Sequence, residues 1–160
     1  MKRTFLLCLL LPSLAIAQAS STSPPLAADA AVTTWLERSL ASYLELYRGL
    51  HQHPELSLQE RQTSTLVARE LKRYGYTVTA NVGGYGVVGV LKNGTGRTLL
   101  LRGDMDALPV AEQTGLPYAS TVQVKDASGQ SVALMHACGH DMHVTNLLAT
   151  AGYLAKNKTQ

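Results

Sequence analysis

The chain has 160 residues, with 14 Lys and Arg against 11 Asp and Glu, and a formal net charge of +3. This small excess, without a basic stripe interleaved with aromatic residues, argues against a nucleic-acid partner. About 140 residues remain after the amino-terminal segment discussed next, enough for one domain with a core of its own. No internal repeat or low-complexity tract is visible.

The first 19 residues have the pattern of a secretory signal peptide. Lys2 and Arg3 precede a mostly apolar run over residues 4–16, and small residues at Ala15, Ala17 and Ala19 form two overlapping cleavage sites. The run is too short to span a bilayer, which takes roughly 20 apolar residues. We therefore expect residues 1–19 to be removed, residues 20–29 to be a linker, and residues 30–160 to form an exported periplasmic or extracellular domain that does not touch a membrane.

Helical periodicity dominates the first part of this domain. A first helix is expected from about Asp29 to Leu50, because proline disfavours helical backbone just before His53-Pro54. Residues 57–60, Ser-Leu-Gln-Glu, form a capping-box pattern that predicts the start of a second helix. Gly75 is expected to end that helix. Its buried face is predicted to carry Val67, Leu71 and Tyr74.

The centre of the chain is predicted to form strands. Residues 76–80 and 86–91 are two candidates, and residues 97–102 a third. This third run is nearly all apolar at its centre, as in an interior strand of an α/β sheet. Residues 131–135 predict a further short strand. A last helix follows, with one apolar face formed by Val144, Leu147, Leu148, Ala151 and Leu154.

The densest group of metal-binding and proton-transferring side chains lies between that short strand and the last helix, in the run His136-Ala-Cys138-Gly-His140-Asp141-Met-His143. Thiolate and imidazole suit zinc and its borderline neighbours. After cleavage Cys138 would be the only cysteine, so no internal disulfide could form. The plain alternative is a buried cysteine near surface histidines.

Two carboxylates follow the predicted third strand, at Asp104 and Asp106. Ligands of open α/β sheets bind outside the carboxyl ends of the strands. We therefore expect both carboxylates to converge with Cys138 and His140 on one rim. The alternative is that they only stabilise a turn.

Three motifs now resemble the amidohydrolase branch of the dinuclear metallopeptidases, which includes hippurate hydrolases, N-acyl-amino-acid amidohydrolases and auxin-conjugate hydrolases. The motifs are Leu-His-Gln-His-Pro-Glu-Leu-Ser at 50–57, Arg-Gly-Asp-Met-Asp-Ala-Leu-Pro at 102–109 and Met-His-Ala-Cys-Gly-His-Asp-Met-His at 135–143. The resemblance implies an α/β fold: a mixed-sheet, zinc-peptidase-like catalytic domain with helices packed on the sheet, here incomplete and without the inserted lid domain.

The resemblance also implies roles for single residues. Cys138 and His140 would be metal ligands, and Asp106 the aspartate that orients the site from behind. Asp104 stands where related peptidases place a histidine ligand. Asp141, His143 and His136 would support the helix start or line the pocket. His51 we place in an interhelix turn, outside the ligand set.

The family further implies two divalent metal ions, zinc or manganese, a small N-acyl amino acid or peptide as substrate, and a possible homodimer. Its general base belongs to an adjacent Glu-Glu pair that these 160 residues do not contain. We therefore expect an amino-terminal portion of a hydrolase, with at most a partial metal site and no activity alone. Two alternatives are a secreted non-catalytic metal-binding module and a hydrolase with Cys138 as nucleophile.

Overall fold

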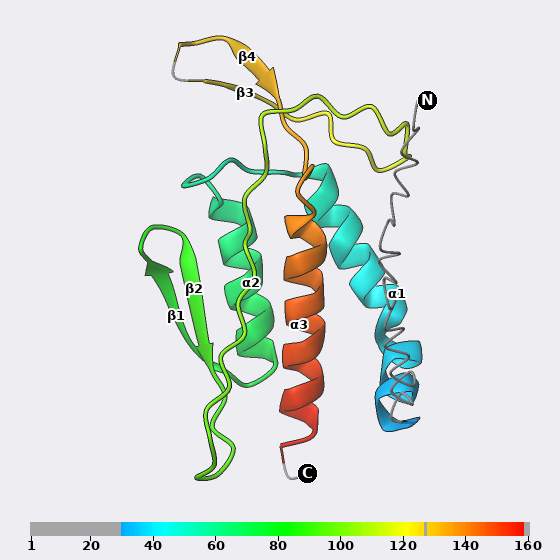
Figure 1. The fold of residues 1–160 in the computed structure, drawn as a ribbon, viewed down its shortest axis with the longest axis vertical. Coiled ribbons are helices and arrows are strands. Elements are labelled where there is room, and N and C mark those ends of the chain that lie inside the picture. Colours follow the sequence, from blue (N-terminus) through cyan, green and yellow to red (C-terminus); the bar gives the residue numbers. More distant parts are fainter. Residues whose placement is uncertain (1–29, 127, 159–160) are drawn as a thin grey trace, which may run out of the picture.

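The computed structural model describes residues 30–126 and 128–158, so the predicted signal peptide and most of the linker lie outside it. In these residues three helices lie side by side (Figure 1): α1 (Ala30–Gln52), α2 (Arg61–Arg73) and α3 (His140–Lys156). The central helix, α3, runs antiparallel to α1 (Figure 1). All three predicted helices are confirmed. Over the described ranges, no helix combines the length and apolarity needed to cross a bilayer.

The helices meet in one apolar core, built from Leu50, Val67, Leu71, Val144, Leu148 and Ala151. At the far end of the α1–α3 interface, the Trp35 ring packs edge-on against Tyr153, with ring centroids 5.5 Å apart. Gly152 permits this close approach, because a Cβ atom there would lie 2.7 Å from the hydroxyl of Tyr43. The apolar face predicted for the last helix therefore packs against α1 and α2, although Leu154 on this face is 39% exposed.

Two antiparallel hairpins flank the helices. β1 (Thr77–Val82) pairs with β2 (Gly86–Val90) and packs against α2, whereas β3 (Gln123–Lys125) pairs with β4 (Ser131–Ala133) beyond the amino-terminal end of α3 (Figure 1). The strands predicted near residues 76–80, 86–91 and 131–135 are thus confirmed. β3 was not predicted, because three residues are too few to show a period.

The third predicted strand, over residues 97–102, is wrong. This stretch takes no strand conformation, and the side chains of Leu99 and Leu100 are 73% and 87% exposed. A strand exists only where a neighbouring strand supplies hydrogen-bonding partners. Within the described part of the chain no strand lies along this stretch, so its apolar side chains remain uncovered.

The predicted capping box is also wrong. The N-cap position of α2 belongs to Glu60, whose side chain makes no capping hydrogen bond. Leu58 takes a positive φ of 64° and turns the chain, which leaves Ser57 too far ahead of the helix. Instead, the carboxylate of Glu55 accepts hydrogen bonds from the backbone N–H groups of Gln62 (3.0 Å) and Thr63 (2.8 Å). The acidic side chain of Glu55, five residues before the N-cap, thus accepts the free backbone N–H groups in the first turn of α2.

Candidate metal site

Backbone hydrogen bonds bring the second motif between the first and the third. Residue Ala107 forms a parallel bridge with Leu56, and its N–H donates to the Glu55 carbonyl over 2.7 Å. On the other side Leu108 pairs with Met135 in an antiparallel bridge, with N–O distances of 3.0 and 3.1 Å. Asp104 and Asp106 therefore lie beside the turn that begins α3, although no strand end brings them there.

One imidazole in this turn is held in a defined orientation. The Nδ1 atom of His140 lies 2.8 Å from the backbone carbonyl of Asp106 and 3.0 Å from its Oδ1 atom. A backbone carbonyl oxygen and a carboxylate oxygen can only accept, so Nδ1 carries the proton and donates. The Nε2 atom of a neutral His140 then keeps its lone pair. This carboxylate–imidazole arrangement is the one that orients histidine ligands of metal ions.

Three donor groups converge beside this imidazole. Ligand atoms of Asp104, His140 and His143 all lie within 4.8 Å of one another. The rings of His140 and His143 are 5.3 Å apart, and Arg102 binds the Asp104 carboxylate over 3.0 Å. Two imidazoles and a carboxylate form a set that suits zinc or manganese, and three protein ligands are typical of a catalytic zinc site. The residues present therefore fit a divalent metal.

The cysteine predicted as a ligand lies apart from this group. Cys138 is exposed, unpaired and absent from the cluster of Asp104, His140 and His143. It occupies the turn before α3, in which Gly139 adopts a φ of 76° and donates to the carbonyl of His136. Positive φ at this position requires a residue such as glycine. The structure thus brings Asp104, Asp106, His140 and His143 together, with Cys138 two residues away along the chain.

Behind the cluster is a buried ionic network that was not predicted. Nδ1 of His51 lies 2.7 Å from Oδ2 of Asp141, and Nε2 lies 3.0 Å from Oε1 of Glu112. Both carboxylates accept only, so both ring nitrogens carry protons and His51 is an imidazolium. Burial alone would lower the pKa of His51, but the hydrogen bonds to Glu112 and Asp141 outweigh it and raise that pKa.

Glu112 also fixes the loop above this imidazole. Its carboxylate accepts hydrogen bonds from the Thr114 hydroxyl and the Ser120 backbone N–H. Burial opposes ionisation of Glu112, but these bonds and His51 together lower its pKa. Nothing in the sequence marks a lone glutamate in a loop as special. His51 was expected in an interhelix turn; it lies instead in the last turn of α1, outside the cluster of metal donors.

His136 and Asp141 are both buried rather than lining an open pocket, with 4% and 2% exposure. Neither ring nitrogen of His136 has a hydrogen-bonding partner among the described residues. Burial lowers the pKa of His136, which favours the neutral ring. Within the first turn of α3, Oδ1 of Asp141 also accepts the N–H of Met142 over 2.8 Å.

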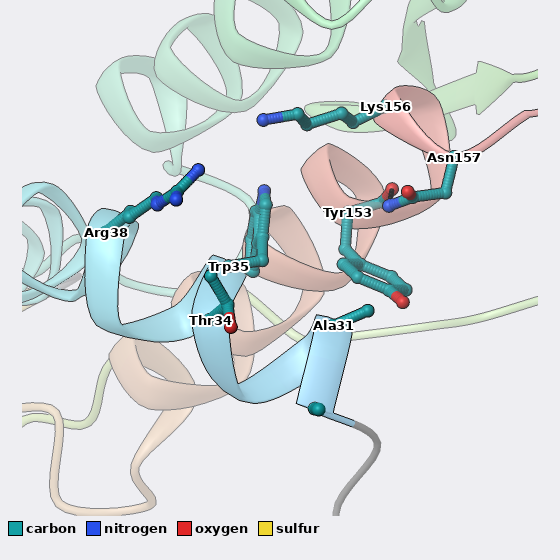
Figure 2. Close-up of a pocket in the computed structure, with 8 residues that line it drawn as sticks. Ala31, Thr34, Trp35, Arg38, Tyr153, Lys156 and Asn157 are labelled. Atoms are coloured by element: carbon teal, nitrogen blue, oxygen red, sulfur yellow. Dashed lines mark hydrogen bonds between the residues drawn. The ribbon is translucent and has the colours of Figure 1, made fainter.

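A surface pocket at the other end of α3 takes no part in this chemistry. Figure 2 shows it between the start of α1 and the end of α3, with Trp35, Arg38, Tyr153 and Lys156 in its wall. Its walls carry no carboxylate, imidazole or thiol, so it offers neither metal ligands nor a proton acceptor suited to hydrolysis.

Known proteins are similar to this chain. Residues 100–160 match the profile of a family described as Peptidase family M20/M25/M40. A hippurate hydrolase of Campylobacter jejuni is 49% identical over 107 residues, which cover 66% of this chain and 26% of the relative. Thermostable carboxypeptidase 1 of Saccharolobus solfataricus is 44% identical over 117 residues, or 72% of this chain and 28% of the relative.

The fold agrees as well. The crystal structure of the YXEP protein of Bacillus subtilis, described as a dinuclear metal binding peptidase from the M20 family, superposes with a TM-score of 0.64 at 32% identity. The superposition covers 79% of this chain and 33% of that one. The chain is therefore similar to M20/M25/M40 peptidases in sequence, over residues 100–160, and in fold. It spans about a quarter to a third of the length of these relatives, and its α/β fold matches part of the YXEP structure.

Proposed function

We propose that the polypeptide containing this chain is a metal-dependent hydrolase of amide bonds in N-acyl amino acids or small peptides. The observation that carries the proposal is the His140 imidazole, which is oriented by Asp106. A ligand atom of this imidazole lies within 4.8 Å of ligand atoms of Asp104 and His143. The family match over residues 100–160 and the names of the relatives, a hippurate hydrolase and a carboxypeptidase, support a substrate with an amide next to a free carboxylate.

We propose the following roles for residues of this chain. His140 offers Nε2 to a metal ion, and Asp106 fixes the ring tautomer and raises the basicity of that nitrogen. The cluster suggests Asp104 and His143 as further ligands, and the family resemblance suggests Cys138. We propose zinc or manganese as the metal, with two ions in the complete site. When bound, such ions lower the pKa of a water molecule and polarise the amide carbonyl.

The proton acceptor must come from elsewhere in the polypeptide. In the family this role belongs to a glutamate of a Glu-Glu pair, and no such pair occurs in these 160 residues. Such a base takes a proton from the attacking water and returns it to the leaving amine. We therefore propose that residues 30–158 contribute part of the metal site and its orienting aspartate, without the base.

The decisive experiment is a hydrolysis assay of the polypeptide encoded by the whole reading frame that contains this chain. Benzoylglycine, acetyl-amino acids and dipeptides would serve as substrates, with and without a chelator. We expect turnover that the chelator removes and added zinc or manganese restores. Turnover that survives chelation but is lost on alkylation of Cys138 would instead support a cysteine nucleophile. Metal binding without turnover would support a non-catalytic metal-binding module.

We also propose that the protein is exported. The support is the order of positive residues, apolar run and small residues in positions 1–19, which precede the described part of the chain.

A further inference from the structure

The buried network formed by Glu112, His51 and Asp141 links three parts of the chain that are far apart in the sequence. His51 lies in the last turn of α1, Asp141 in the first turn of α3, and Glu112 in the loop between β2 and β3. Their side chains are 6%, 3% and 1% exposed. Charged groups this deeply buried are costly unless each is paired, and here a single imidazolium pairs with both carboxylates.

The network also complements the two helices. A cation at the carboxyl end of α1 and an anion at the amino end of α3 each interact favourably with their helix dipole. Because α1 and α3 run antiparallel, these two ends meet (Figure 1). The contact between His51 and Asp141 therefore joins the helix ends where their charges are most favourable.

The position of Asp141 on α3 connects the network to the metal donors. Successive helix residues are rotated by about 100°, so His140 and His143 lie roughly 60° apart on one face of the first turn. Asp141 lies about 160° from His143 by the same geometry. The buried Asp141 is thus anchored on one side of the turn, while His140 and His143 reach Asp104 on the other.

We propose that Asp141, held by His51 and Glu112, is a positioning residue that sets the rotation of the first turn of α3 and so keeps His140 and His143 aimed at Asp104. This inference rests on the proposed metal site. None of the three network residues is in the donor cluster, so we expect them to act on the geometry of the donors through the backbone of the turn. The turn transmits this effect, since the N–H of His143 donates to the Gly139 carbonyl over 3.1 Å.

The test measures the Co²⁺ affinity of the polypeptide encoded by the whole reading frame that contains this chain, together with the visible absorption spectrum of the bound ion. Asp141→Asn keeps the shape and an acceptor oxygen but removes the charge. We expect its Co²⁺ affinity to fall on the order of 10–100-fold, with a changed absorption spectrum. Glu112→Gln removes the charge that binds the other ring nitrogen of His51. This variant replaces Asp141→Asn in the test if Asp141→Asn does not fold. We expect the same direction of change from it.

Two controls separate positioning from general damage. Leu71→Val disturbs the apolar core near the carboxyl end of α2. Asp126→Asn removes an exposed carboxylate from the β3–β4 turn. Both should leave the spectrum unchanged and the affinity within roughly twofold, even where Leu71→Val lowers the unfolding temperature as much as Asp141→Asn does. Equal losses of affinity in Leu71→Val and Asp141→Asn, or normal binding by a folded Asp141→Asn, would overturn the proposal.

The same measurement distinguishes this proposal from the proposed function. If the wild-type polypeptide binds no Co²⁺, or binds it equally well after His140→Ala, the metal site itself is wrong and both ideas fail. If binding depends on His140 but Asp141→Asn behaves like the controls, only the positioning role fails.

Discussion

The imidazole of His51 donates a hydrogen bond to the carboxylate of Asp141 over 2.7 Å, although 90 residues separate them in the sequence. The contact ties the end of α1 to the start of α3, directly behind the candidate metal donors. Glu112 holds the other ring nitrogen. His51, the first of the two histidines in the first motif, is therefore a buried cation between two carboxylates.

This ion pairing predicts a pH dependence of stability. The pKa of His51 is raised on folding, so its contribution is fully present below the unfolded pKa of about 6.5. It is lost as the pH rises through the higher pKa of the folded state. We expect the free energy of unfolding to fall as the pH rises above about 6.5, and to fall less in His51→Gln.

Denaturant unfolding of both proteins across that range provides the measurement. The difference between them is the relevant quantity, because the buried His136, whose pKa is lowered, titrates in both. Parallel pH profiles for the wild type and His51→Gln would contradict the expected role of His51.

Asp106→Asn should weaken metal binding without abolishing it. The amide keeps the shape of the aspartate but removes the charge that makes His140 a better ligand, so we expect a loss of zinc affinity on the order of 10–100-fold. Competition with a chromophoric chelator would measure it. Asp126→Asn is the matched control, since it removes a carboxylate from an exposed turn. Equal zinc affinity in the two variants would remove Asp106 from the site.

Glu55→Gln should destabilise the fold through α2. The Glu55 carboxylate accepts two backbone N–H groups of the first turn, and loss of such a cap costs about 1 kcal/mol. Glu45→Gln is the control, because Glu45 forms only an exposed 3.5 Å pair with Arg48, which contributes roughly 0.5 kcal/mol or less. Urea unfolding that ranks Glu45→Gln as the more damaging variant would refute this cap.

Export predicts a specific amino terminus. Since the small residues at Ala15, Ala17 and Ala19 define overlapping cleavage sites, exported protein should begin at Gln18 or Ser20. Amino-terminal sequencing of the exported protein would show this. Protein that retains Met1 outside the cytoplasm would contradict cleavage.

The helices could be predicted from the sequence because helical periodicity is a local pattern, whereas the convergence of the motifs was inferred from expected strand ends. Leu71 in α2 and Val144 in α3 each belong to a helical repeat of apolar residues and are buried. Asp106 comes close to His140 as expected. The reasoning for that convergence was nevertheless wrong, since residues 97–102 form no strand. Backbone bridges at Ala107 and Leu108 position the aspartates instead.

Long-range polar contacts could not be predicted. Glu112 is one glutamate in an irregular loop, and only the fold shows that it binds His51. The same holds for Glu55, which replaces the predicted capping box because Leu58 turns the chain. A single sequence contains periodicity and spacing, whereas these contacts depend on which distant segments become neighbours.

The most direct test of the metal site is the zinc affinity of the polypeptide encoded by the whole reading frame, before and after His140→Ala, measured by equilibrium dialysis and elemental analysis. The imidazole of His140 is the oriented donor of the cluster, so its removal should weaken binding more than the roughly 10–100-fold expected when an orienting partner is lost. Zinc bound per chain should then fall well below that of Asp126→Asn under the same conditions. Unchanged zinc affinity in a folded His140→Ala chain would contradict a metal site at the start of α3.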